Sequence, residues 1–395
     1  MKRDKERRIK IVDTLSKQIT GEWGSDSGNE EEKVCVLRTT NFRNDCTVNY
    51  TNVVTRYVNP VKIESKKLIP GDIILEKSGG SDNFPVGRVV YFEHDGVYLC
   101  NNFTHTLRTD DSIINPRYLV HNMSYLYHCG VTKQYQSKTT GIRNLKVKDY
   151  LNVEIPLPPL DVQRRIADTL DKVTELITLR KTQLEKLDEM VKARFVEMFG
   201  GISDSKIYPY KAVKELTDVI SGGTPSREVS EYWEGGTIPW VKTTELQNNI
   251  ITEIDEHITE AGLDNSSAKL VPAGTVLIAM YGQGRTRGMT GYLGVEACTN
   301  QACACILPSD GINQRYLWQY FVLSYDNLRD MAKGGNQPNL NGNIIKNYPI
   351  LYPPMELQNQ FVAFVEQTDK SKVIIQQSLY TLETLKKSLM QEYFG

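Results

Sequence analysis

Two stretches of the chain, residues 160–199 and 355–394, carry apolar residues at alternating steps of three and four, separated by polar residues. This spacing is typical of a helix that buries one narrow face. Each stretch follows a double proline, and proline is favoured where a helix begins. We therefore predict two long helices, with a seam of Ile166, Leu170, Val173, Ile177, Leu184, Leu187 and Val191 in the first and of Phe361, Val365, Ile375, Leu379, Leu382 and Leu389 in the second.

A helix of about 40 residues is about 60 Å long, too long to bury its apolar stripe on one small domain. The natural partner of each predicted helix is the other one, so we predict an antiparallel coiled coil that acts as a spacer. Two independent helical hairpins, or a zipper that joins two copies of the chain, are the alternatives.

The remaining parts of the chain contain short β-rich runs separated by glycine-rich turns. Examples are Asp72–Leu75 and Thr275–Ala279, with turns at Gly79-Gly80 and Gly222-Gly223. This composition predicts an α+β fold with twisted sheets. We place two globular domains at residues 1–154 and 205–347, and the two helical segments at 155–204 and 348–395.

The chain contains an internal repeat with a period close to half its length, which indicates a two-fold pseudo-repeat in the fold. The matched pairs come in one order with slowly drifting offsets. They include Lys10, Val12, Ile19 and Gly21 with Lys211, Val213, Ile220 and Gly222; Leu68-Ile69-Pro70 and Leu75 with Leu270-Val271-Pro272 and Leu277; Cys100 and Asn102 with Cys298 and Asn300; Asn115 with Asn313; Asn144-Leu145 with Asn339-Leu340; and Gln163 with Gln358.

Composition adds few constraints. The net charge is −1, so the chain lacks the basic excess that is typical of a nucleic-acid binder. A locally basic groove is still compatible with this charge balance. No apolar run approaches the roughly 18 residues of a membrane span, and the charged N-terminus does not resemble a signal peptide. We expect a soluble, intracellular protein with no membrane partner.

The sequence shows no convincing catalytic or metal-binding motif. There is no phosphate-binding G-x-x-x-x-G-K-[ST] loop, and neither double proline has the polar and aromatic neighbours of an amino-methyltransferase motif. The five histidines and seven cysteines lack the spacing of metal ligands, so we expect reduced structural thiols. We predict no catalytic residue, no metal and no cofactor in this chain.

The loops between the predicted strands contain the side chains that proteins use to contact DNA. The segment Tyr281–Gly288 stands out, because its glycines allow close approach of the backbone to phosphate beside two arginines and a glutamine. Residues matched in both halves are expected to hold the shared frame. The candidates for DNA contact are Arg38, Thr39, Asn41, Arg43, Asn44, Lys77, Arg88, Lys133, Gln136, Lys138 and Arg143 in the first half, and Thr224, Lys242, Thr243, Tyr281, Gln283, Arg285, Arg287, Asn336, Gln337 and Asn339 in the second.

These features together resemble the DNA-specificity subunits of type I restriction–modification systems. The resemblance rests on Ile155–Gln163 leading into a long helix, its echo at Tyr352–Gln358, the Asn-Leu step upstream of each, and Gly222–Pro225 followed by Gly235–Trp240. It implies two target-recognition domains for a bipartite double-stranded DNA target, two methyltransferase subunits and motor-nuclease subunits as partners, and S-adenosylmethionine, ATP and Mg in those partners. It also implies a cytoplasmic, nucleoid-associated prokaryotic protein. One departure is that the family's N-terminal conserved segment is reduced to little more than Met1–Lys10.

Two other classes of protein remain open at this point. One is a coiled-coil interaction protein without a DNA role, and the other is a self-contained DNA methyltransferase or nuclease. The sequence gives neither the bases recognised, nor the gap between the half-sites, nor the oligomeric state. It also does not separate a full restriction system from a modification-only system.

Overall fold

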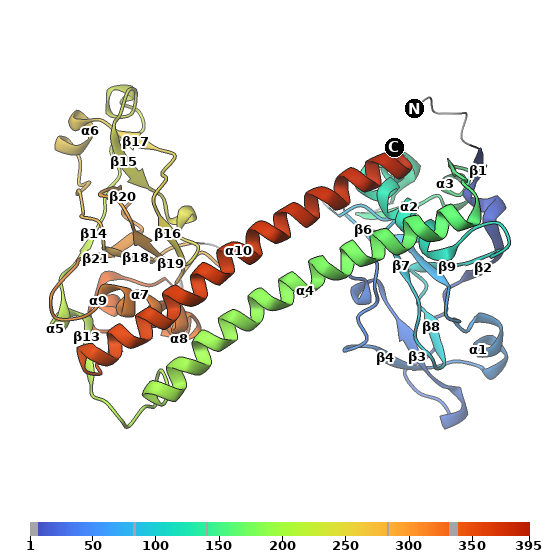
Figure 1. Cartoon of the computed structure of the whole chain (residues 1–395), viewed down its shortest axis with the longest axis horizontal. Helices are drawn as coiled ribbons and strands as arrows, with labels where there is room; N and C mark the ends of the chain where they lie inside the picture. Colours follow the sequence, from blue (N-terminus) through green and yellow to red (C-terminus); the bar gives the residue numbers. More distant parts are fainter. Residues whose placement is uncertain (1–6, 82–83, 140, 283, 332–338) are drawn as a thin grey trace. The chain divides into compact units, whose positions relative to one another are not determined.

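The computed structural model describes residues 7–81, 84–139, 141–282, 284–331 and 339–395, which form two compact units. Unit 1 comprises residues up to Thr182 together with Gln376–Gly395, and unit 2 comprises Gln183–Ile375. The two predicted long helices are confirmed, as α4 (Leu160–Phe199) and α10 (Met355–Phe394) (Figure 1). Each helix contributes one part to each unit. None of the helices in the described ranges is long and apolar enough to cross a membrane.

Unit 1 is built on a four-stranded antiparallel sheet in the order β2-β9-β5-β7. A second sheet, β4-β3-β8, contains one parallel pair, and a third has the order β10-β11-β6. The strands are β1 (Arg8–Lys10), β2 (Leu15–Thr20), β3 (Lys33–Leu37), β4 (Val54–Tyr57), β5 (Ile73–Glu76), β6 (Ser78–Gly80), β7 (Val89–Tyr91), β8 (Tyr98–Cys100), β9 (Thr104–Thr109), β10 (Gln136–Thr139), β11 (Ile142–Leu145) and β12 (Glu154–Pro156), and the shorter helices are α1 (Pro60–Lys66), α2 (Pro116–His128) and α3 (Val147–Tyr150).

Unit 2 repeats this plan around a five-stranded sheet, β14-β21-β18-β19-β16, and a three-stranded sheet, β17-β15-β20. Its strands are β13 (Tyr210–Ala212), β14 (Val219–Ser221), β15 (Ile238–Val241), β16 (Asn249–Ile251), β17 (His257–Ile258), β18 (Val276–Ala279), β19 (Thr290–Leu293), β20 (Cys298–Thr299), β21 (Cys303–Ile306) and β22 (Pro349–Leu351), and its shorter helices are α5 (Val213–Leu216), α6 (Glu260–Asp264), α7 (Gln314–Leu323), α8 (Tyr325–Met331) and α9 (Gly342–Lys346). The mixed α and β composition and the internal repeat are therefore confirmed.

The same set of hydrogen bonds, made by a buried glutamine, connects the start of each long helix to its domain. In unit 1 the backbone N–H of Asn115 donates to Gln163 Oε1 at 2.8 Å, and Gln163 Nε2 donates to the carbonyl of Pro158 at 2.8 Å. In unit 2, Asn313 and Gln358 repeat the first bond at 2.9 Å, and Gln358 Nε2 donates to Pro353. Both glutamines are about 1% exposed, so their bonds are shielded from water. The glutamine after each double proline is therefore part of the shared frame.

The register of the strands corrects part of the sequence alignment between the halves. Equivalent backbone bonds, Glu22 N–H to Cys100 O and Gly223 N–H to Thr299 O, pair Cys100 with Thr299 rather than with Cys298. Phe92 N–H donates to Asp72 O as Leu293 N–H donates to Thr275 O, so Asp72 is equivalent to Thr275. The match of Leu68–Leu75 to the second half therefore shifts by one residue as well. Sequence matching placed these blocks one residue out of register. The halves differ by small insertions between strands, and chance identities beside the equivalent residues were matched instead.

The two long helices run antiparallel within each unit. In unit 1, Leu170 clusters with Met390 and Phe394, and Lys181 pairs with Glu383 at 2.9 Å. In unit 2, Asp188 pairs with Lys372 at 2.7 Å, and the rings of Phe195 and Phe361 lie 5.4 Å apart. The predicted seam residues Ile166, Leu170, Val173, Ile177, Val191, Phe361 and Val365 are buried, and Leu184, Leu187, Ile375, Leu379, Leu382 and Leu389 are partly buried. A regular coiled coil along the full length stays a prediction.

A charged cluster holds α4 to α2 in unit 1. His121 Nε2 lies 2.7 Å from Asp171 Oδ1, and Arg117 Nη1 donates to Asp171 Oδ2 at 3.1 Å. Burial opposes ionisation of Asp171, but the hydrogen bonds and charges of His121 and Arg117 outweigh it and lower its pKa. In unit 2 the residue matched to Arg117, Arg315, lies 4.2 Å over the ring of Tyr292, as Arg117 lies 5.3 Å over that of Tyr91. The positions of His121 and Asp171, however, are occupied there by Gln319 and Glu366. This cluster therefore belongs to one half only.

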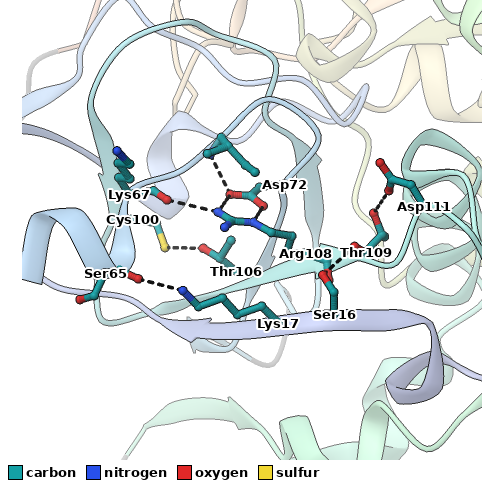
Figure 2. A network of polar contacts seen from close by, with 11 residues as sticks. Ser16, Lys17, Ser65, Lys67, Asp72, Cys100, Thr106, Arg108, Thr109 and Asp111 are labelled. Carbon is teal, nitrogen blue, oxygen red and sulfur yellow. Dashed lines mark hydrogen bonds and ion pairs between the residues drawn. The ribbon is translucent and has the colours of Figure 1, made fainter.

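A second half-specific feature lies in the unit 1 sheet (Figure 2). Asp72 is fully buried and accepts two hydrogen bonds from Arg108, at 2.8 and 2.9 Å. Arg108 also donates to the carbonyl of Lys67 at 3.3 Å, and the N–H of Ile69 donates to Asp72 at 2.9 Å. By strand register, Thr275 and Leu307 occupy the two positions in unit 2, so that half does without the ion pair.

Candidate nucleic-acid interface

The first candidate loop of unit 1, residues 38–44, follows β3 and is tightly braced from inside. Asn41 is 2% exposed; its Oδ1 accepts the backbone N–H of Arg38, and its Nδ2 donates to the carbonyl of Asn49 at 2.9 Å. Arg38 donates to the carbonyl of Asn52 at 3.0 Å. Arg43 and Asn44 are exposed at the end of the loop, and Thr39 is partly buried.

The second candidate loop of unit 1 connects β5 to β7 and includes β6. Arg88 donates twice to Glu76, both at 2.9 Å, and once to the carbonyl of Thr39 at 3.3 Å. Arg88 therefore links the two loops, and Asn41 and Arg88 both stabilise the conformation of these loops. The polar atoms of both residues bond within the protein, where they satisfy buried groups, and their contact with DNA stays a prediction.

The small sheet β10-β11-β6 gathers most of the other candidates of the first half. Lys138 on β10 lies directly opposite Arg143 on β11, and Arg143 lies opposite Gly80 on β6. Lys77 precedes β6, and its N–H donates to the carbonyl of Phe103 at 2.9 Å. Gln136 donates to the carbonyl of Val86 at 3.0 Å, and Lys133 is exposed nearby on the chain. Three cationic side chains thus come from one small sheet and the residue before it, an arrangement that suits an anionic partner.

In unit 2 the equivalent loop is residues 280–288, between β18 and β19. Equivalent bonds, Leu145 N–H to Lys77 O and Leu340 N–H to Met280 O, place it at the same position in the repeat as the unit 1 loop. Tyr281 is 41% exposed, Arg285 is exposed and Arg287 is partly buried. The glycines at 282, 284 and 288 have positive φ, a backbone conformation that glycine adopts without strain.

Two residues that sequence reasoning missed hold this loop in place. Arg329 on α8 donates to the carbonyls of Gly284 and Arg287, at 2.9 and 3.0 Å, and Tyr325 donates to the carbonyl of Arg285 at 2.8 Å. They lie about 40 residues beyond the loop in sequence, and no local pattern connects the two segments. Only the packing of α8 against the β18–β19 connection identifies them.

The remaining candidates of unit 2 are partly committed to the protein. Lys242 pairs with Glu256 at 2.8 Å, and Arg227, which was not predicted, pairs with the same carboxylate at 2.6 Å. The hydroxyl of Thr224 bonds to Gln301. Thr243 and Asn339 are partly buried. Gln283, Asn336 and Gln337 lie outside the described residues.

The described residues contain no group of three or more His, Cys, Asp or Glu side chains positioned to hold a metal ion. All seven cysteines are free thiols. Burial raises the pKa of Cys46, Cys100 and Cys303, and it raises that of Cys298 and Cys305 to about 11. Because the thiolate is the reactive form, these five thiols are unreactive at neutral pH.

The repeated frame with divergent loops agrees with the result of the family comparison. A family model described as the type I restriction modification DNA specificity domain matches residues 28–189 and 208–384, one match in each half. These matches cover most of the chain, which therefore belongs to this family of DNA-specificity domains.

Several curated relatives are specificity subunits of type I restriction enzymes. The chain is 31% identical over 191 residues to the MjaIX specificity subunit of Methanocaldococcus jannaschii, covering 46% of this chain and 43% of the relative. It is 24% identical over 233 residues to the EcoR124I/EcoR124II specificity subunit of Escherichia coli, covering 56% and 57%. The chain thus spans about half the length of these two relatives. With the EcoKI specificity subunit of E. coli K12, 22% identity extends over 92% of this chain and 82% of the relative.

Two solved structures share the fold along the whole chain. The S subunit of a type I restriction–modification system from M. genitalium matches with a TM-score of 0.58 and 14% identity, covering 100% of this chain and 98% of that one. A chain from a type I R-M system, described in connection with complex assembly and conformational transition, gives a TM-score of 0.56 at 18% identity with the same coverage. At these identities the similarity concerns the fold.

Proposed function

We propose that this chain is the specificity subunit of a type I restriction–modification complex. Each half binds one part of a split double-stranded DNA sequence, and the chain directs methyl transfer and restriction that partner subunits carry out. Catalysis, with S-adenosylmethionine, ATP and Mg, belongs to those partners, which are two methyltransferase subunits and motor-nuclease subunits.

One observation carries this proposal: the two halves share a frame and differ in the loops at the same position of that frame. The frame residues Gln163 and Gln358 make the same bonds, whereas residues 77–88 and 280–288 differ in length and chemistry. A frame that is repeated with different loops suits the recognition of two different short sequences. In an enzyme with a single active site, by contrast, one half would be expected to depart from the shared frame.

The long helices supply the spacer in this proposal. A helix of about 40 residues is about 60 Å long, and one turn of B-DNA is about 34 Å, so the half-sites are separated by one turn or somewhat more. Insertion of one heptad in both α4 and α10 is expected to change the gap and leave both half-sites unchanged. A change in base identity would contradict the spacer role.

The test is to co-express this chain with the methyltransferase subunit encoded beside it and to map methylated adenines across the host genome by single-molecule sequencing. The expected result is one split motif, with two short defined halves around a fixed unspecified gap. Absence of methylation, with both subunits soluble and co-purifying, contradicts the proposal and favours an interaction protein without a DNA role. Methyl transfer by the isolated chain favours a self-contained enzyme instead.

Salt dependence separates the same alternatives in vitro. A protein that neutralises several phosphates loses affinity steeply as salt rises, because bound counterions are released. The assembled complex is expected to show this slope on a duplex that contains the mapped motif. A complex whose DNA affinity does not depend on salt would argue against phosphate contacts by Lys77, Lys138 and Arg285.

A further inference from the structure

Unit 2 contains a polar groove of about 450 Å³ between β14, the segment that carries Lys269, and α9. Strand β14 lies at the edge of the five-stranded sheet, so the groove opens on the side of that strand that faces away from the sheet. The polar residues that line it are Ser221, Lys269, Asn341, Asn343 and Lys346. None of the described residues that line it is acidic. A groove with this lining suits an anionic ligand.

The two lysines of the groove are not used within the protein. Lys269 and Lys346 are both exposed, as are Ser221 and Asn343 beside them. In the ranges that the structure describes, neither lysine makes an ion pair or a side-chain hydrogen bond. Lys242 of the same unit, by contrast, is paired with a carboxylate. The charges of Lys269 and Lys346 are therefore available to a ligand.

The internal repeat gives Lys269 a counterpart in unit 1. Asp72 is equivalent to Thr275, and a lysine lies six residues before each of them, Lys66 in unit 1 and Lys269 in unit 2. The two halves thus have the same cation at the same position of the frame, and its surroundings can be compared directly.

In unit 1 a carboxylate neutralises this lysine. Lys66 Nζ donates to Glu22 Oε2 at 2.7 Å, and Lys62 Nζ donates to Glu22 Oε1 at 3.3 Å. The hydrogen bond from Lys66 lowers the pKa of Glu22, so the carboxylate is charged at neutral pH. Unit 2 has Gly223 at the position of Glu22, and a Cβ there would overlap the backbone of Ser267. Packing therefore excludes a carboxylate from this position of unit 2.

The groove adjoins the candidate interface of unit 2. Leu340 N–H donates to Met280 O at 3.1 Å, at the start of loop 280–288, and Asn341 follows Leu340 as the first residue of the groove wall. On the other wall, Ser221 is the last residue of β14 and lies three residues before the candidate Thr224. A ligand that extends from the loop along this end of the sheet therefore reaches the groove.

We propose that Lys269 and Lys346 bind a phosphate of the DNA backbone beside the half-site of unit 2. This inference rests on the proposed function and specifies how one half of the chain is anchored on DNA. The ammonium group of lysine is a common phosphate ligand, and the hydroxyl of Ser221 and the amide of Asn343 are hydrogen-bond donors next to it. Contacts of this kind fix the position of a protein on a duplex and carry no sequence information. At the equivalent position of unit 1, Glu22 occupies the lysine instead.

The experiment uses the complex of the full chain with its methyltransferase subunit and a duplex that carries the mapped motif. The double variant Lys269→Ala with Lys346→Ala is expected to weaken binding about fivefold per lysine at physiological salt, because each phosphate contact releases about 0.9 of a counterion. The plot of log affinity against log salt is expected to become shallower by about 2. The methylated motif is expected to stay unchanged, because no base contact is lost.

A phosphate scan of the same duplex locates the contact. Methylphosphonate replaces one backbone phosphate at a time and removes its charge. The wild-type complex is expected to lose affinity at one or two neighbouring phosphates beside one half-site, and the double variant is expected to be insensitive at those positions. Arg329→Ala, which is expected to weaken binding at one half-site only, shows which half-site belongs to unit 2.

Two control variants make the result specific. Lys66→Ala removes the equivalent lysine of unit 1, which Glu22 already neutralises, and is expected to leave the salt slope and the phosphate scan unchanged. Lys269→Arg with Lys346→Arg keeps both charges and is expected to retain the salt slope. Since both lysines are exposed, hydrogen exchange in β14 and α9 is expected to be the same in the alanine variant as in wild type.

The outcomes separate this inference from the proposed function. If the wild-type complex methylates a split motif, and the alanine variant matches it in affinity, salt slope and phosphate scan, the phosphate site is refuted while the proposed function stands. The site is also refuted if Lys66→Ala lowers the salt slope equally, because the effect then reflects net charge alone. If the wild-type complex neither binds nor methylates a split motif, both proposals fail.

Two other occupants of the groove would each refute the inference. If the alanine variant lowers co-purification of the methyltransferase subunit and leaves the salt slope intact, the groove binds a protein. If phosphorus NMR shows inorganic phosphate bound to the wild-type complex and not to the variant, with the salt slope on DNA unchanged, the groove holds a free anion.

Discussion

The ion pair of Asp72 and Arg108 allows a quantitative test of how the two halves of the fold diverged. Arg108→Leu copies the residue that unit 2 has at this position, Leu307, but leaves the Asp72 carboxylate buried. It removes three hydrogen bonds, two of them to Asp72, and leaves that carboxylate only the N–H of Ile69 at 2.9 Å. Removing one partner of a buried ion pair costs about 3–5 kcal/mol, so unit 1 is expected to lose about that much stability.

The double variant Asp72→Thr with Arg108→Leu copies both residues of unit 2 and is expected to recover most of this loss, to within about 1 kcal/mol of wild type. Asp72→Thr alone leaves a partly exposed guanidinium that water can solvate, and is expected to cost about 1–2 kcal/mol. The two substitutions therefore have a favourable coupling of about 2 kcal/mol or more in a double-mutant cycle.

Hydrogen exchange followed by mass spectrometry measures this effect in the full chain. Peptides covering β5 and β9 report on unit 1, and those covering β18 and β21 serve as an internal reference. Lys17→Leu, which changes the neighbour of Arg108 on β2, is the control, and its effect is expected to stay within about 0.5 kcal/mol. A loss below about 1 kcal/mol in Arg108→Leu, or a double variant whose loss is the sum of the two single ones, would refute the argument.

Three further predictions address the frame, the charged cluster and the loop of unit 2. Gln163→Ala leaves the Asn115 N–H and the Pro158 carbonyl without their partner and is expected to cost about 2–5 kcal/mol in denaturant unfolding, against little for the exposed Arg164→Ala; equal effects of the two would contradict the fastening role. Because the pKa of Asp171 is lowered in the folded state, its contribution to stability is present above about pH 4 and is lost as pH falls below that value, so Asp171→Asn is expected to flatten the fall in melting temperature between pH 5 and 3; an unchanged slope would argue against it. Arg329→Ala frees the carbonyls that it holds and is expected to speed amide exchange in residues 280–288 and to weaken binding at one half-site only, which methylation mapping measures; exchange as slow as in wild type would show that α8 does not hold the loop.

The position of the two long helices could be predicted from the sequence because their signals are local. A heptad spacing and a double proline each act within a few residues, and α4 and α10 begin and end where the pattern places them. The repeat was also visible, and with it the division of the chain into two similar halves.

The candidate interface was predictable only in part. The chemical types of the loop residues suit an anionic partner, but sequence does not show which side chains the fold uses internally. Asn41 and Arg88 bond to groups within the protein, whereas Phe84, an apolar residue with no polar signal, is 76% exposed. Arg329 bonds to loop residues that lie about 40 positions before it in the sequence, and contacts of this kind leave no local sequence pattern.

The sequence by itself determined the two long helices, the pseudo-repeat and the family, because these depend on periodicity and on matched short motifs. Tertiary structure alone decided the register of the repeat and the roles of its polar residues. In unit 1 the Cys100 thiol lies 3.1 Å from the Thr106 hydroxyl, and in unit 2 the Thr299 hydroxyl lies 3.2 Å from the Cys305 thiol, so the same contact is kept with its two residues exchanged. Residue-by-residue matching misses that exchange, because packing conserves the contact between two strands and not the identity of the residue on either one.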